Sequence, residues 1–155
     1  MLNNNATQVC PCHSGRLYSD CCGKFINTSE YPDTAEQLMR SRYSAYTLKD
    51  EAYLLNSWHK STRPVSLDIQ NDTTQWKKLK IISSSDNNVT FLAFFNDNIK
   101  VKDRLLFLYE ESNFIKDRHW FYVEGHNLKT GELSKNMLCP CQSGKKFKRC
   151  CAKEI

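Results

Sequence analysis

Apolar residues recur with the spacing of a helix between residues 31 and 59. Asp33, followed three residues later by Glu36, predicts a capping box at the start of a first helix, and Asp50 predicts the cap of a second one. A third, short helical piece is expected at about residues 67–75. The buried stripe predicted for the first helix follows the i, i+3, i+4 pattern and comprises Ala35, Leu38, Met39, Tyr43 and Tyr46.

After Trp76 the apolar residues alternate with polar ones, which is the period of strands. The helices come first along the chain and a meander of antiparallel strands follows. This order indicates an α+β fold. We expect the helices to pack on a curved antiparallel sheet, which encloses a cone with a mouth. The predicted strands lie around residues 79–81 and over residues 89–95, 102–115 and 119–124, the last closed by Gly125, with turns at 83–88 and 116–118.

The two ends of the chain carry the same pattern. Residues 10–22 read CPCHSGRLYSDCC and residues 139–151 read CPCQSGKKFKRCC, with seven of 13 positions identical and no gap in the spacing. The proline fixes one φ angle between the first two cysteines, and the Ser-Gly pair offers the positive φ that reverses the chain. The stretches at 16–20 and 145–149 are long enough for a turn of helix that would carry the last two cysteines.

Four thiolates within 13 residues are the ligand set of a structural zinc site. The N-terminus shows no secretory signal, so we expect a cytoplasmic protein whose thiols stay reduced. Disulfides, iron–sulfur ligation and reactive thiols remain the alternatives. The favoured interpretation is two zinc ions per chain, held by Cys10, Cys12, Cys21, Cys22, Cys139, Cys141, Cys150 and Cys151.

The formal net charge of +5 changes once metal is considered. Two sites of four thiolates and one Zn²⁺ each add about −2, which leaves a net charge of roughly +1. The overall charge therefore gives no reason to expect a nucleic-acid partner. Cations nevertheless surround the second cysteine group, where they either offset the thiolates or form a contact surface for RNA, the ribosome or an acidic protein. These candidate partner-binding residues are Lys145, Lys146, Lys148 and Arg149.

The spacing Cys-x-Cys-x₈-Cys-Cys at both ends resembles the SEC-C motif. This zinc-binding module is best known from the C-terminal tail of the preprotein translocase ATPase SecA, where it serves partner binding. The middle of the chain resembles the bacterial YchJ family, whose members are similar to this chain over essentially its full length and are functionally uncharacterised. The stretches that carry this second resemblance are residues 34–46, 53–55, 58–59, 110–114 and 120–125.

The YchJ resemblance implies three units, with a SEC-C motif on either side of a core similar to nuclear transport factor two. We therefore divide the chain into an N-terminal zinc knuckle at residues 8–24, a cone-like middle domain at residues 31–126 and a C-terminal zinc knuckle at residues 137–153.

One carboxylate lies on a predicted strand face that is otherwise largely apolar. If the face of Glu110 points inward, burial raises its pKa unless a cation pairs with it, and Arg40 or Arg42 on the first helix can supply that cation. His59, beside Trp58, would titrate near neutral pH. Acid–base catalysis by His59 or Glu110 in an aromatic pocket is one interpretation, and a satisfied Arg–Glu pair in a packed core is the other. Glu110 shares its face with Leu106, Leu108, Ser112 and Phe114.

These features favour a non-enzymatic zinc protein that acts as a protein-interaction or adaptor module, with a middle domain able to hold a small ligand. One alternative is a small-molecule enzyme with lyase or isomerase chemistry in the cone. Another is association with RNA or the ribosome through the basic C-terminal knuckle. No run of about 18 apolar residues is present, so no membrane span is expected.

Overall fold

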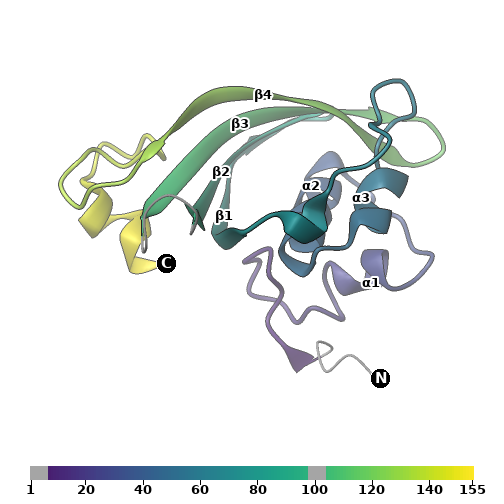
Figure 1. The fold of residues 1–155 in the computed structure, drawn as a ribbon, viewed down its shortest axis with the longest axis horizontal. Helices are drawn as coiled ribbons and strands as arrows, with labels where there is room; N and C mark the ends of the chain where they lie inside the picture. Colours follow the sequence, from purple (N-terminus) through teal and green to yellow (C-terminus); the bar gives the residue numbers. More distant parts are fainter. Residues whose placement is uncertain (1–6, 98–103) are drawn as a thin grey trace.

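The computed structural model describes residues 7–97 and 104–155, and its architecture is α+β (Figure 1). Helices come first and strands follow, as the sequence pattern predicts. The elements are α1 (Gly23–Ile26), α2 (Ala35–Leu48), α3 (Glu51–Asn56), the 3₁₀ turn η2 (Ile69–Asn71), β1 (Thr74–Ser84), β2 (Asn88–Asp97), β3 (Leu105–Lys116), β4 (Trp120–Glu132), and the 3₁₀ turns η3 (Phe147–Arg149) and η4 (Cys151–Lys153). No helix in the described ranges is long and apolar enough to cross a membrane.

The four strands form one antiparallel sheet in the order β1-β2-β3-β4. Shifts of register interrupt the β1–β2 ladder and the β3–β4 ladder at two places each, and irregularities of this kind bend and twist strands. Figure 1 shows the arch that results. The helices α2 and α3 lie against one end of the sheet, and the C-terminal turns lie at its other end.

The strand β2 is buried on both of its faces. Phe91 and Ala93 belong to one core cluster, together with residues of α2 and the N-terminal cysteines. Leu92 and Phe94 point to the opposite face, where they pack against the C-terminal cysteine segment. The sequence predicted one buried face, from Val89 to Phe95, and the second is buried because the C-terminal segment folds back onto it.

The helix caps lie at or next to the predicted positions. α2 begins after Thr34, whose hydroxyl accepts a hydrogen bond from the backbone N–H of Gln37 at 3.1 Å. The prediction of a capping box from Asp33 and Glu36 is therefore wrong by one residue, because two overlapping frames fit the same four-residue pattern. Asp50 caps α3 as predicted, by accepting a backbone N–H bond at 2.9 Å.

Two other helix predictions need correction. The helical piece expected at residues 67–75 is reduced to the single turn η2, because β1 already begins at Thr74. The turn of helix expected at residues 16–20 is not formed, and α1 instead begins at Gly23, after the last N-terminal cysteine. In the C-terminal repeat a 3₁₀ turn does precede the last two cysteines, as predicted.

The last strand is longer than its apolar pattern. The prediction that Gly125 closes β4 is wrong, because β4 pairs with β3 as far as Glu132. Beyond Gly125 most of its side chains are exposed, so this part of the strand is held by backbone pairing with β3 rather than by a buried face. Of the strand predicted over residues 102–115, residues 102 and 103 lie outside the described ranges.

Segments outside the sheet bond to both of its edge strands. At the β1 edge, the backbone N–H of Leu79 donates to Nδ1 of His13 at 3.4 Å. At the β4 edge, the backbone of Tyr122 bonds to Ser57 and His59, at 2.9 and 2.7 Å. Contacts of this kind reduce the exposed pairing groups of an edge strand.

Candidate metal centres and the central cavity

The structure gathers the eight cysteines into two groups of four, one from each end of the chain, and all eight are free. Within each group the four sulfur atoms lie within 4.8 Å of one another. Cys12 Sγ lies 3.6 Å from Cys21 Sγ, and Cys141 Sγ lies 3.5 Å from Cys150 Sγ. A tetrahedral ion with bonds of about 2.3 Å holds its sulfurs about 3.8 Å apart, whereas a disulfide needs about 2.05 Å. The spacing is that of ligands around a single ion.

The two groups are built by the same backbone path. In the first, the N–H of Cys10 donates to the carbonyl of Arg16 at 2.8 Å, and the equivalent bond in the second has the same length. Gly15 and Gly144 have φ angles of +80° and +74°, a region that favours glycine. The serine before each glycine places its hydroxyl 3.2 Å from a cysteine sulfur of its own group. The sequence assigned these serines to the turn, and their contact with sulfur was not predicted.

The thiols of one group cannot all ionise without a counter-ion. Hydrogen bonds with Cys12 and Cys22 lower the pKa of Cys10 to about 3, while hydrogen bonds with Cys10 and Cys12 raise the pKa of Cys22. In the second group, burial raises the pKa of Cys151. Burial also opposes ionisation of Cys141, but hydrogen bonds outweigh it and lower that pKa to about 6. Because crowded thiolates repel one another, a dication suits this donor set.

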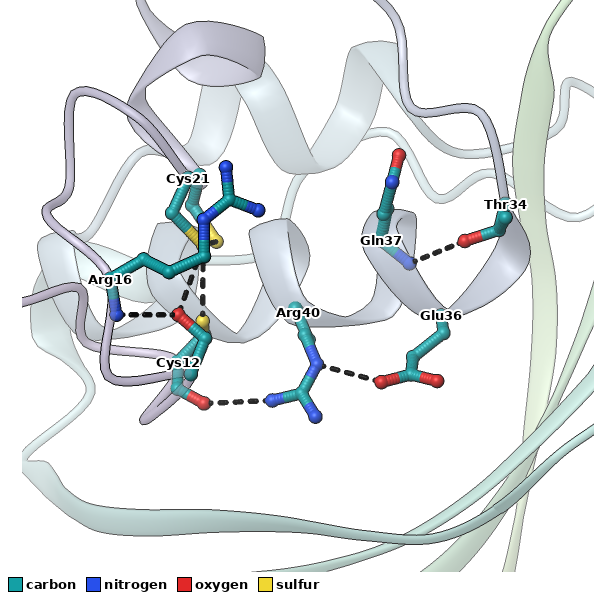
Figure 2. Close-up of polar contacts among 9 residues, drawn as sticks. Cys12, Arg16, Cys21, Thr34, Glu36, Gln37 and Arg40 are labelled. Carbon is teal, nitrogen blue, oxygen red and sulfur yellow. Dashed lines mark hydrogen bonds and ion pairs between the residues drawn. The ribbon is translucent and has the colours of Figure 1, made fainter.

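The N-terminal group is packed against α2. Cys10 and Cys12 are buried, and Cys10 Sγ lies 3.7 Å from the hydroxyl of Ser44 in that helix. Figure 2 shows Arg40 reaching from α2 to the knuckle: its Nε donates to Glu36 at 2.9 Å and its Nη1 donates to the carbonyl of Cys12 at 3.2 Å. Arg40 therefore ties the N-terminal group to the middle of the chain.

The C-terminal group is packed against the opposite face of the sheet. The ring of Phe147 is buried and stacks on Phe94 of β2, with ring centroids 6.1 Å apart. Lys80 of β1 places its Nζ 3.6 Å from Cys151 Sγ, and a neighbouring lysine of β1 forms an ion pair of 2.8 Å with the segment after the last cysteine. Both cysteine groups are thus integrated into the fold.

The two groups differ in the cations around them. In the first, Arg16 donates to the carbonyl of Asp20 and Arg40 is paired with Glu36. In the second, the four candidate partner-binding cations are exposed, and no ion pair within the described ranges involves them. These are Lys145, Lys146, Lys148 and Arg149.

A cavity of about 260 Å³ lies between α2 and the sheet, and it contains two of the predicted residues, Arg42 and Glu110. The face of β3 that carries Glu110 points inward, which is the condition under which the sequence pattern predicts a buried carboxylate. Arg40 does not line the cavity, because residues two apart on a helix are turned by about 200° from each other. Other lining residues are Tyr43, Tyr46, Trp76, Phe91, Ser112 and Tyr122.

The structure does not bring His59 or Trp58 to the cavity lining. The backbone N–H of His59 donates to Tyr122 of β4 at 2.7 Å, and its ring lies 5.9 Å from Phe121, whose side chain leaves the sheet on the other face. Trp58 meets the ring of Tyr122 edge-on, with centroids 4.8 Å apart. The expectation that His59 and Glu110 meet in one pocket is therefore wrong. The backbone of His59 pairs with β4, and its ring lies beside Phe121.

Arg42 and Glu110 do not form the ion pair that the sequence suggested. Arg42 Nη1 donates to the carbonyl of Leu54 and the hydroxyl of Ser57, both at 2.7 Å. Glu110 Oε1 accepts a bond from Ser112 Oγ at 3.0 Å, and no ion pair within residues 7–97 and 104–155 involves it. Burial raises the pKa of Glu110, and the Ser112 bond and the charge of Arg42 oppose this only in part.

A four-cysteine group at each end of a curved sheet with helices against it defines a class of protein, the SEC-C proteins with a middle domain of this fold. The SEC-C motif matches residues 7–24 and 136–153. The family described as "YchJ, middle NTF2-like domain" matches residues 34–125. The chain belongs to the YchJ family.

The relatives of this chain resemble it over most of its length. A UPF0225 protein of Sodalis glossinidius is 39% identical over 153 residues, covering 92% of this chain and 96% of the relative. A UPF0225 protein of Photorhabdus laumondii is 40% identical over 159 residues, covering 94% and 99%. The crystal structure of a SEC-C motif containing protein from Psychrobacter arcticus has a TM-score of 0.60 at 28% identity, covering 97% of this chain and 99% of that one.

A further solved structure resembles most of this chain. The solution structure of a SEC-C motif containing protein from Rhodopseudomonas palustris has a TM-score of 0.68 at 29% identity, and it covers 79% of this chain and 100% of that one.

Proposed function

We propose that this protein is a cytoplasmic zinc protein that binds two ions and acts as an adaptor for a protein partner, while its middle domain holds a small ligand. The observation that carries the proposal is the packing of each four-cysteine group into the core of the fold. Four thiolates without an open position are the ligand set of structural zinc. Because a knuckle of this size has too little core to fold alone, metal binding supplies its folding energy.

The C-terminal knuckle is the proposed contact surface. Its four cations are exposed and have no carboxylate partner in the described ranges, whereas cations beside the first knuckle are engaged with their own chain. Leu138, in the same knuckle, is 68% exposed. An apolar residue beside unpaired cations suits a partner surface that is acidic with an apolar centre.

We propose binding rather than catalysis for the middle domain. Its cavity holds one carboxylate and a satisfied guanidinium, and His59, one of the two residues considered for acid–base catalysis, lies outside it. Aromatic walls with a few polar groups are typical of sites that bind small molecules.

Elemental analysis of the native protein tests the metal part of the proposal. We expect about two zinc ions per chain, and about one in each of the single variants Cys12→Ser and Cys141→Ser. Lys145→Gln, beside the second site, serves as the control and should retain both ions. A folded native protein without zinc, or with a different metal in both sites, would refute this part.

Affinity capture from a cell extract tests the adaptor part. One variant replaces the four cations of the C-terminal knuckle by glutamine, and the matched control replaces four exposed lysines elsewhere, Lys60, Lys77, Lys116 and Lys129. We expect a protein partner that is retained by the control, lost by the knuckle variant and resistant to nuclease treatment. Equal loss in both variants would contradict the proposal, and loss on nuclease treatment would favour RNA association instead.

A further inference from the structure

The carboxylate of Glu110 occupies a place that the neighbouring strand keeps open. A Cβ atom added to Gly125 of β4 would lie 2.2 Å from Glu110 Oε1 and 2.9 Å from the hydroxyl of Tyr122. Contacts this short do not occur, so only glycine allows the carboxylate to lie where it does. Ser112, two residues along β3, holds the same oxygen with a hydrogen bond of 3.0 Å.

The other charged group of the cavity already has its partners. The guanidinium of Arg42 is bonded to α3 and the residue after it, as described above, and it lies over two rings, 4.2 Å from the centroid of Tyr122 and 5.0 Å from that of Trp58. A cation held by a carbonyl, a hydroxyl and aromatic faces is well satisfied. The unmet capacity of the cavity therefore lies on Glu110 and on the hydroxyl of Tyr43, which is buried without a hydrogen-bond partner.

Both groups can accept hydrogen bonds. An ionised carboxylate accepts about four hydrogen bonds, and the described residues supply Glu110 with one from a side chain, that of Ser112. A ligand that satisfies Glu110 must therefore donate hydrogen bonds. Even partial burial of an unpaired carboxylate is costly for the folded state, so this half-buried Glu110, with a glycine that makes room for it, suits a group that meets its partner on binding.

The walls around Glu110 are aromatic. Trp76 lies next to Tyr43 and Tyr46, with ring centroids 5.8 and 6.4 Å away, and Phe91 closes the sheet side of the cavity. Aromatic rings around a carboxylate attract organic cations, because the ring faces carry negative charge. The volume of about 260 Å³ lies just below the range of about 300–1,000 Å³ that is usual for ligand pockets, so the ligand is small.

We propose that this cavity binds a small organic ammonium ion, with its nitrogen against Glu110 and its apolar body among the aromatic rings. This inference rests on the ligand-holding part of the function proposed above and adds the chemical class of the ligand. The ammonium group would donate to the carboxylate as a charge-assisted hydrogen bond, which is stronger than a bond between neutral groups.

Calorimetric titration of the zinc-loaded, full-length protein provides the test. The probe is phenethylammonium, and two molecules of similar size serve as controls: 2-phenylethanol, which is neutral, and 3-phenylpropionate, which is an anion. We expect phenethylammonium to bind at millimolar concentrations or below, and both controls to bind at least about tenfold more weakly, a difference of about 1.4 kcal/mol.

Two neighbouring substitutions on β3 locate the binding. Glu110→Gln should weaken phenethylammonium binding by at least about tenfold. Glu111→Gln, on the opposite face of the same strand, should leave it unchanged. Thermal unfolding and zinc content establish first that both variants are folded and loaded.

The outcomes separate this inference from the proposed function. If 2-phenylethanol binds as well as phenethylammonium, or if Glu110→Gln has no effect, the cavity still holds ligands but the ammonium inference is wrong. If none of the three probes binds to folded, zinc-loaded protein, the ammonium inference is overturned together with the ligand-holding part. The zinc and adaptor parts of the proposed function are tested by their own experiments, described above.

Discussion

The replacement Phe147→Ala removes the main anchor of the C-terminal knuckle on the sheet. The ring is 5% exposed and stacks on Phe94, which is fully buried. The same cluster contains Leu92, Phe107 and two of the C-terminal cysteines. Removing the ring leaves a cavity that the knuckle can close only by moving its cysteines, because Cys151 lies four residues away on the same short segment.

The size of the effect follows from the burial. Replacing a buried phenylalanine by alanine costs about 3–5 kcal/mol in well-packed cores, and a domain of this size has a free energy of unfolding of about 5–15 kcal/mol. We therefore expect Phe147→Ala to lose a large part of the total stability. Leu138→Ala, in the same knuckle but 68% exposed, should stay within about 0.5 kcal/mol of the native protein.

Urea unfolding of the zinc-loaded protein measures this difference, and release of zinc to a coloured chelator reports on the second site. We expect the variant to unfold at lower urea and to release about one of its two ions faster than the native protein does. A loss of less than about 1 kcal/mol in the free energy of unfolding, or unchanged release of both ions, would mean that the knuckle does not depend on the sheet face that carries Leu92 and Phe94. The packing described above would then be wrong.

Three further predictions concern the middle of the chain. Gly125→Ala should lower the free energy of unfolding by about 1–3 kcal/mol, because the added methyl group collides with Glu110. Thermal unfolding measures this loss, and adding Glu110→Ala to Gly125→Ala should recover part of it. A double variant without any recovery would contradict this reason. Glu110→Gln should be more stable than the native protein at neutral pH. Burial raises the pKa of Glu110, and the charges of Arg42 and His126 oppose this only in part. The charged form of Glu110 is therefore disfavoured in the folded state. This gain in the free energy of unfolding should disappear as the pH falls below the ordinary carboxyl pKa, where Glu110 is protonated in both the folded and the unfolded chain. Urea unfolding at several pH values measures the gain, and a gain that grew in acid would refute the prediction. Thr34→Ala should cost about 1 kcal/mol through loss of the α2 cap, whereas Asp33→Ala should cost clearly less, and the reverse order in thermal unfolding would restore the predicted capping box.

Short-range chemistry made the two four-cysteine groups predictable. The cysteine spacing, the Cys-Pro-Cys turn and the positive φ at Gly15 and Gly144 are local features, so two ligand groups and their internal symmetry can be anticipated without tertiary structure. The order of helices and strands was also predictable, because the apolar spacing changes from about 3.6 to 2 residues near Trp76, although β1 already begins at Thr74.

Long-range packing could not be predicted from the same patterns. The second buried face of β2, at Leu92 and Phe94, depends on a segment some 50 residues away in the chain. The extension of β4 beyond Gly125 depends on the length of β3. The pattern suggested that Arg40 or Arg42 would pair with Glu110, but it could not include the carbonyl of Leu54 that satisfies Arg42 instead.

The two-sided burial of β2 has a consequence for how the nascent chain reaches its folded state. The helices and the first knuckle are synthesised before the sheet, so one face of β2 can be covered while translation continues. Leu92 and Phe94 have no cover until Phe147 has left the exit tunnel. A chain that lacks the C-terminal knuckle therefore presents a bare apolar strand face, of the kind that leads to aggregation or recognition by chaperones.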